Sequence, residues 1–312
     1  MQGLLDRSLL VVTGKGGVGK TTVAAALGLL AAGRGRHTTV VELGEQSRLS
    51  LLFGRRAAEP GSATELTERL SSLSVDMDRA LLEWLQALGG RVSGRVLASS
   101  GTFQYFTAAA PGAKELITMV KIANMTRARG RGRGRAAARP LVILDAPATG
   151  HALGMLRSPE TFGAIARVGP VARQTAQLGE LLRDHARSAY IAVAQGAEMA
   201  VTETLELQQG LVQALGRELD AVVVNALLPR RFSAEEMRRI EALAPSRGRK
   251  GELFGAAMRA AREVHERGRY QHGQLARLRR RGMNVKTLPF HWGAELDLAA
   301  VRELAEKLGR EI

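Results

Sequence analysis

The chain has 312 residues, 45% of them hydrophobic, which is enough to bury a substantial core and excludes a disordered or fibrous protein. It has no cysteine, which excludes disulfides, thiolate zinc sites and a cysteine nucleophile. Its net charge of +15 is uneven, since residues 127–139 carry six arginines and no acid, and residues 247–281 carry eleven Lys or Arg against three acids. The rest of the chain is nearly neutral, so the pattern indicates a balanced globular body with basic attachments.

Targeting signals are not evident in the sequence. It shows neither a signal-peptide pattern nor a run of about 18 apolar residues. We therefore expect a cytoplasmic protein without a transmembrane segment, and peripheral association with a membrane stays open.

The first predicted strand is the apolar run Leu9–Thr13, which is rich in β-branched residues and ends in glycines. The Ala- and Leu-rich segment Thr21–Ala32 that follows is expected to be helical. Comparable apolar strands recur at Thr38–Glu42, Leu141–Asp145, Tyr190–Ala194, Ala221–Asn225 and Val285–Leu288. Apolar strands that alternate with helices predict an α/β fold, with a mostly parallel sheet flanked by helices on both faces. A mixed-charge helix at Glu295–Leu308 is expected to close a single domain over residues 1–312.

Residues 55–139 interrupt this alternation and are interpreted as a helical insertion. Helical spacing is present in Leu66–Leu73, Ala80–Leu88 and Lys114–Met125, and no further strand is expected before residue 139. The insertion ends in the Arg/Gly-rich run 127–139, which has no periodicity and is expected to be a loop. That run is either a solvated linker or a basic patch for nucleic acid.

A phosphate-binding motif lies between the first strand and the first helix. The motif G-x-x-x-x-G-K-[ST] is matched by Gly14, Lys15, Gly16, Gly17, Val18, Gly19, Lys20 and Thr21, and Thr22 is added to the expected nucleotide-binding residues. The glycines let backbone N–H groups turn toward phosphate oxygens at the positive end of the helix. Lys20 is expected to reach the β- and γ-phosphates, and the Thr21 hydroxyl to ligate Mg²⁺. The motif predicts a P-loop nucleotide-binding protein that uses ATP or ADP and Mg²⁺.

An acid near the metal is also needed for phosphoryl chemistry. Asp145 ends the apolar strand Leu141–Asp145 and is the expected second metal residue. Strands that end in an acid are common in α/β proteins, so Asp145 alone is weak evidence for a metal site, and the residues that follow it are needed to support the assignment.

That context resembles one family of ATPases. The extra lysine, Lys15, is typical of the deviant Walker A class, in which it acts across a dimer. The segment Asp145–His151 (DAPATGH) resembles the switch II pattern D-T-A-P-T-G-H of the arsenite-pump and tail-anchored-protein-targeting ATPases. Further similarities are Glu198–Leu207 (EMAVTETLEL), Val222–Pro229 (VVVNALLP), and Pro111-Gly112 with Glu115. The chain is identified from about residue 9 to 290 as a member of this family, similar to its actinobacterial-type paralogues described as anion-transporting ATPases.

The resemblance implies roles for residues at the base end of the nucleotide. Asn225 is expected to hydrogen-bond the adenine, because an amide offers both a donor and an acceptor to the purine edge. Pro289 and Phe290 are expected to flank the same base. The alternative for Asn225 is a turn residue at the end of a strand.

Two departures from the family limit which activities can be transferred. Arsenite-binding members and zinc-clamped targeting members both use cysteines, so neither arsenite export nor a zinc-held dimer is expected. The segment Met155–Ser188, which supplies Met-rich helices for transmembrane clients in targeting members, is short and has one methionine. The insertion adds Met77, Met119 and Met125. Helix positions such as Leu116, Met119 and Ile122 are therefore interpreted as ordinary core.

The third departure concerns hydrolysis. Aligning Val41–Gly54 with the family's switch I D-P-A-H-S through the shared L-S-x-x-F-G places Gly44 on the water-orienting Asp. Glycine has no side chain for that role, so Glu42 and Glu45 are the candidate replacements. The predicted catalytic residues are thus Lys15, Lys20, Asp145, Glu42 and Glu45, with slow hydrolysis by the protein alone.

Three functions remain open from the sequence. The first is a nucleotide-switched dimer, formed with itself or with a paralogue, that handles a protein client. The second is a weakly hydrolysing regulatory subunit of a paralogous heterodimer. The third, a nucleic-acid-associated partition-type ATPase, fits the basic segments but not the Thr-Gly-His end of switch II, so nucleic acid is not the expected partner.

Overall fold

The computed structural model describes residues 3–44, 47–59, 61–84, 112–127, 140–165, 169–243, 249–293 and 295–312. Its strands are β1 (Leu9–Gly14), β2 (Thr38–Leu43), β3 (Ala63–Thr67), β4 (Leu70–Val75), β5 (Leu141–Asp145), β6 (Ser188–Gln195), β7 (Ala221–Leu227) and β8 (Val285–Pro289). Its helices are η1 (Leu4–Asp6), α1 (Lys20–Gly33), α2 (Arg48–Leu52), α5 (Ala113–Met125), α6 (Thr149–Ile165), α7 (Gly169–Arg183), α8 (Glu198–Leu215), α9 (Ala234–Glu241), α10 (Arg249–Arg280) and α11 (Leu298–Gly309).

Within the described residues, the strands form one eight-stranded sheet in the order β3-β4-β2-β5-β1-β6-β7-β8. All neighbouring pairs are parallel except β3 and β4. The register pairs Val12 of β1 with Asp145 of β5, and Gln195 of β6 with Asn225 of β7. The carboxyl ends of these strands therefore meet at one edge of the sheet, where ligands bind in open α/β folds.

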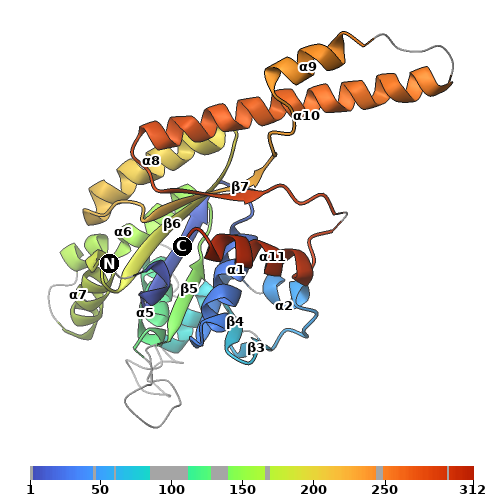
Figure 1. Ribbon diagram of the computed structural model, residues 1–312. Coiled ribbons are helices and arrows are strands. Elements are labelled where there is room, and N and C mark those ends of the chain that lie inside the picture. The colour runs from blue at the N-terminus through green and yellow to red at the C-terminus, as the bar shows by residue number, and fades with distance from the viewer. Residues whose placement is uncertain are drawn as a thin grey trace.

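Helices cover both faces of the sheet (Figure 1), and the side chains of β1 alternate between the two cores. Leu10 and Val12 point into the core shared with α1 and α11, whereas Leu9 and Val11 point into the core shared with α5, α6 and α7. Both faces being buried explains why the strands are continuous apolar runs. The predicted α/β fold with a mostly parallel sheet is confirmed.

One part of the expected helical insertion is wrong. The segment Leu66–Leu73 is not helical: it lies in an antiparallel hairpin of β3 and β4, and β4 pairs in parallel with β2. Leucines at 66, 70 and 73 have the spacing of a helix face, but β4 pairs with β2, β3 pairs with β4, and Leu66 and Leu70 are buried in the same core as α1. The tertiary pairing overrides the local periodicity.

The rest of the insertion is partly described. Helix α5 confirms the expected helix at Lys114–Met125, and Leu116, Met119 and Ile122 are buried core as interpreted. Residues 77–84 are helical, whereas the remainder of Ala80–Leu88 lies outside the described residues. Pro111, Glu45 and all but the first residue of the Arg/Gly-rich run 127–139 also lie outside them.

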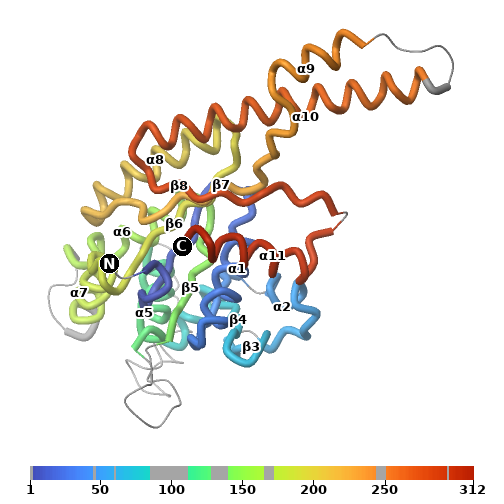
Figure 2. Tube along the Cα trace, viewed as in Figure 1, coloured from blue at the N-terminus to red at the C-terminus, as the bar shows by residue number. Residues whose placement is uncertain are grey.

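The basic segment 247–281 is almost entirely helix α10, which has 32 residues. The C-terminal part of α10 packs beside α8 over β7 and β8, and its N-terminal part extends away from the sheet together with α9 (Figures 1 and 2). Buried Leu275 and Leu278 fix the C-terminal part in the core. Among the helices in the described part of the chain, none combines the length and apolar character needed to cross a membrane.

Candidate nucleotide-binding site

The P-loop leaves the end of β1 and enters α1 at the carboxyl edge of the sheet. Two of its glycines are required by close approaches of neighbouring strands. A Cβ on Gly14 would lie 2.1 Å from the carbonyl oxygen of Val193, and one on Gly19 would lie 2.3 Å from Nδ2 of Asn225. Both glycines have positive φ, +147° and +94°, which disfavours any other residue. The loop therefore presents backbone rather than side chains to the space above it.

Lys20, Thr21 and Asp145 come together beside this loop. The Thr21 hydroxyl donates to Oδ2 of Asp145 at 2.5 Å, and Lys20 Nζ donates to the carbonyl oxygen of Lys15 at 3.2 Å. Burial lowers the pKa of Lys20, although the Asp145 charge raises it. Burial likewise raises the pKa of Asp145, opposed by the Thr21 hydrogen bond and the Lys20 charge. The two partly buried charges thus stabilise each other across the site.

The arrangement fits a divalent metal ion bound together with phosphate. Asp145 Oδ1 is buried and has no hydrogen-bond partner among the described residues. No cluster of three or more His, Cys, Asp or Glu suited to a metal occurs among them either. Mg²⁺ usually takes only one or two groups from the protein and completes its octahedron with phosphate and water. Asp145 and Thr21 could supply those two groups.

A cavity of about 730 Å³ opens above these side chains. Its lining consists of Gly17, Gly19, Lys20, Thr21, Glu42, Leu43, Gly44, Arg48, Asp145, Ala146 and Pro147. The lining thus joins the P-loop to the ends of β2 and β5 and to the start of α2. Gly44 lies at the cavity with φ +121°, and apart from its chain neighbours no described residue has an atom within 4 Å of where its Cβ would be.

Glu42, one of the two candidate replacements for the missing switch I Asp, hydrogen-bonds the start of α2. Its side chain is buried, and its two oxygens accept hydrogen bonds from the hydroxyl of Ser47 and from the backbone N–H groups of Arg48 and Leu49. Burial raises the pKa of Glu42, opposed by those hydrogen bonds. In this conformation Glu42 holds a helix terminus and has no lone pair directed freely at the cavity.

Lys15 is bound within its own chain. Its Nζ lies 2.6 Å from Oε1 of Glu203 on α8, and both side chains are about two-thirds buried, with 35% and 27% exposed. The extra lysine of the P-loop is therefore held against α8, beside the loop that contains Lys20.

Asn225, Pro289 and Phe290 lie on the opposite side of β1 from Asp145 in the sheet order. Asn225 ends up beside the P-loop, where its Nδ2 donates to the carbonyl oxygen of Val18 at 2.9 Å. Phe290 follows β8, and its backbone N–H donates to the carbonyl oxygen of Leu227 on β7. Phe290 also lines a separate cavity of about 470 Å³ with Trp292, whose ring meets it edge to face at 4.9 Å. The predicted base residues therefore lie near the carboxyl ends of β7 and β8, which are close together because these two strands pair in parallel.

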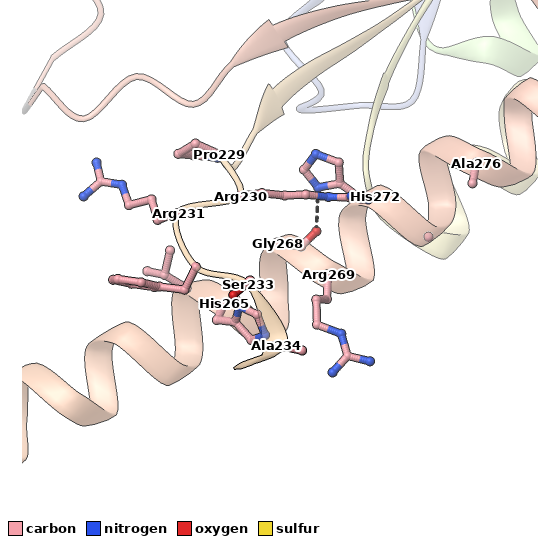
Figure 3. A pocket seen from close by; sticks show the side chains of 13 residues that line it. Pro229, Arg230, Arg231, Ser233, Ala234, His265, Gly268, Arg269, His272 and Ala276 are labelled. Carbon is pink, nitrogen blue, oxygen red and sulfur yellow. Dashed lines mark hydrogen bonds between the residues drawn. The ribbon is translucent and has the colours of Figure 1, made fainter. Parts of the chain in front are cut away.

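Another cavity, of about 450 Å³, lies at the base of α9 and α10 and contains no predicted site residue (Figure 3). Arg230, Arg231, Arg269 and two histidines line it. The guanidinium groups of Arg231 and Arg269 point away from each other, and Arg231 lies 5.1 Å over the ring of Trp292. The cavity is basic, but the guanidinium groups of Arg231 and Arg269 do not converge on a common point.

Sequence reasoning missed Arg48 and Glu203. Both stood inside segments that were already singled out: Glu203 within Glu198–Leu207, and Arg48 at the serine position of D-P-A-H-S when Gly44 is placed on its Asp. The signal for Arg48 was an unusual cation at that position. No sequence signal pairs Glu203 with Lys15, because the two are 188 residues apart.

The P-loop between β1 and α1, with an acid at the end of the adjacent strand β5, defines a P-loop NTPase. Residues 7–169 match the model of the anion-transporting ATPase family, ArsA type, and the chain belongs to this family. It is 30% identical over 239 residues to ATPase BagA of Mycobacterium tuberculosis and to a putative ATPase of Mycobacterium bovis, covering 73% of this chain and 68% of theirs. It is 26% identical over 180 residues to ATPase GET3 of Paracoccidioides lutzii, covering 56% of this chain and 50% of that protein. The identification as a member of the arsenite-pump and targeting ATPase family is confirmed, and with it ATPase activity in general terms.

Proposed function

We propose that the protein is a Mg²⁺-dependent, nucleotide-switched ATPase that forms a dimer and couples ATP binding to the handling of a protein client. The observation that carries the nucleotide part is the Thr21–Asp145 hydrogen bond beside Lys20. Asp145 lines a cavity of about 730 Å³, and its second oxygen has no partner among the described residues. Bound Mg²⁺ would neutralise charge on the terminal phosphates. Thr21 and Asp145 would hold it, and the P-loop N–H groups and Lys20 would orient the phosphates.

The switch part rests on how Asp145 continues into α6. The backbone after Asp145 is fixed to β1, since the Thr13 hydroxyl donates to the carbonyl oxygen of Pro147 at 2.9 Å. Helix α6 begins at Thr149 and packs against α5 through buried residues that include Met155. A change in the Asp145 segment on nucleotide exchange would therefore reach the helical part of the molecule, where we place the client. Slower hydrogen exchange in α5 and α6 with an ATP analogue than with ADP would support this, and identical exchange would contradict it.

The nucleotide site itself is tested by Lys20→Ala. Lys20 is the cation next to the predicted β/γ-phosphate position, and a hydrogen bond to a charged group contributes about 1.5–3 kcal/mol, or roughly 10–150-fold in affinity. We expect calorimetry with Mg·ATP analogue to show a loss of this size. Lys307→Ala, on the exposed face of α11, is the matched control and should bind as the parent does. Unchanged affinity in Lys20→Ala would refute the site.

A second function, a weakly hydrolysing regulatory subunit of a paralogous heterodimer, is favoured by one observation. Gly44, at the position of the family's water-orienting Asp, borders the cavity but has no carboxylate of its own. The Glu42 oxygens accept hydrogen bonds from backbone N–H groups at the start of α2. Positioning of water is much of what an enzyme contributes to phosphoryl transfer, so turnover by the protein alone should be slow although ATP binds.

Steady-state hydrolysis of the protein alone, and of Glu42→Gln, tests this second function. Both should be slow and similar. Robust turnover in the parent that Glu42→Gln abolishes would make Glu42 the water-orienting group and remove the argument for a regulatory subunit. A Gly44→Asp rescue is not a clean test, because a φ of +121° strains any L side chain by about 1–3 kcal/mol.

A further inference from the structure

Arg48 stands at the phosphate cavity and is held there by its backbone. It is the first residue of α2, and Ser47 caps that helix by accepting from Ser50 N–H. The Arg48 N–H donates to Glu42 Oε1 at 3.0 Å, which ties the start of α2 to the end of β2. The position of the Arg48 backbone relative to the sheet is therefore set by the buried Glu42 carboxylate, whereas Arg48 as a whole is exposed.

The Arg48 side chain lines the same cavity as Lys20, Thr21 and Asp145. Burial is the main cause of the lowered pKa of Lys20 and of the raised pKa of Asp145, and the Arg48 charge has a smaller effect that lowers both pKa values. Within the described part of the chain, its guanidinium makes no hydrogen bond or ion pair. Among the described residues Arg48 forms no ion pair with Glu42, whose two oxygens accept hydrogen bonds from the α2 backbone and from Ser47. The cavity thus has an arginine that forms no salt bridge with any side chain the structure describes.

The sheet order shows which end of a nucleotide Arg48 would meet. Strands β5 and β2 lie on one side of β1, and β7 and β8 lie on the other. Asn225 lies near the end of β7 and Phe290 follows β8, and neither of these predicted base residues lines this cavity. Arg48 follows β2, and β2 lies one strand further from β1 than β5, the strand that ends in Asp145. A nucleotide whose base lies at Asn225 would therefore point its terminal phosphate toward Arg48.

We propose that Arg48 binds the terminal phosphate of ATP and so makes the site prefer ATP over ADP. This rests on the nucleotide site proposed above. A guanidinium suits the task because it offers paired N–H donors that match two phosphate oxygens and stays charged at any physiological pH. Helix α2 of the same chain thereby supplies a second cation, in addition to Lys20. This cation lies where ATP has a negatively charged terminal phosphate that ADP lacks.

The experiment compares two ligands on each protein by calorimetry: Mg·ADP and Mg²⁺ with the imido analogue of ATP. Arg48→Ala should weaken binding of the analogue about tenfold or more, the size expected for a lost charged hydrogen bond. It should change ADP affinity by no more than about two- to threefold, because ADP lacks the phosphate that Arg48 meets. Arg56→Ala, an exposed arginine just after α2 that does not line the cavity, is the matched control for lost charge.

Arg48→Lys separates charge from geometry, since lysine keeps the cation but not the paired donors. It should fall between the parent and Arg48→Ala in affinity for the analogue, and it serves as the test if the alanine variant does not fold. An unchanged ratio of analogue to ADP affinity in Arg48→Ala or Arg48→Lys would overturn the proposal. Failure of the parent to bind either ligand would instead overturn the nucleotide site, so the two failures are distinguishable.

Discussion

The ion pair between Lys15 and Glu203 leads to a prediction about subunit association. If Lys15 reaches the phosphates of an opposite subunit, as its family resemblance implies, it must first leave Glu203. Glu203→Gln keeps the shape of the side chain but removes the charge that holds Lys15 at 2.6 Å. The substitution should therefore make nucleotide-dependent association easier.

The size of the effect follows from the exposure of the pair. Both side chains retain about a third of their exposure, 35% and 27%, so the pair belongs with solvent-screened ion pairs of about 0.2–1 kcal/mol. A homodimer releases two such lysines, which gives about 0.4–2 kcal/mol and roughly a 2–30-fold tighter dimer. High salt should shrink the difference between variant and parent, because it screens the pair in the parent.

Sedimentation equilibrium with the imido analogue of ATP measures this directly. Glu206→Gln, three residues further along α8 and exposed, is the control and should leave association unchanged. Lys15→Ala should bind nucleotide but not associate in response to it. Association that is weaker in Glu203→Gln than in the parent would refute the reasoning, since it would mean that Glu203 supports the dimer rather than restraining Lys15.

Three further predictions concern stability and the site. Gly19→Ala should destabilise the fold and weaken nucleotide binding more than Gly17→Ala does. Both substitutions strain the backbone by about 1–3 kcal/mol, but only a Cβ at Gly19 would clash with the Asn225 amide. Differential scanning calorimetry of the two variants, with and without nucleotide, compares their melting temperatures. Burial raises the pKa of Glu42 above 4.5, so its contribution to stability is lost as pH rises through that raised pKa. The melting temperature of the parent minus that of Glu42→Gln should therefore be greater at pH 4.5 than at pH 7.5. Arg217→Ala should lower the free energy of unfolding by about 3–5 kcal/mol in urea titrations, because Arg217 is 1% exposed and donates to buried carbonyls and a carboxylate.

The fold was predictable where local pattern and tertiary role agree. In β1 and β5 the first four residues are apolar because both faces of the sheet are covered, and the apolar runs in the sequence predict these strands close to their true bounds. The hairpin of β3 and β4 was not found, because Leu66 and Leu70 fit a helix face as well as they fit alternate strand positions. Only pairing with β2, 32 residues earlier at the Thr38–Leu70 register, decides between the two.

The site was predictable as far as motifs define it. The P-loop and Asp145 are recognisable because their chemistry requires fixed residue types at a strand end. Glu42 was singled out as a candidate for orienting water, but its partners are backbone N–H groups of α2, which no residue pattern reveals. Arg48 and Glu203 depend on where α2 and α8 lie beside the loop, so their roles follow only from the fold.

The two ends of the site are attached to different parts of the molecule. At the base end, buried Gln271 on α10 accepts from Leu228 N–H at 2.8 Å and donates to the carbonyl oxygen of Ala226, the residue after Asn225. A Cβ on Gly196 would lie 2.6 Å from the Gln271 Cβ, so α10 approaches the sheet edge closely at this point. At the phosphate end, Asp145 leads into α6 and α5. A nucleotide held at both ends would therefore fix the base of α10 through its adenosine part in either ADP or ATP, whereas only its terminal phosphate would distinguish the two states at α2 and α6.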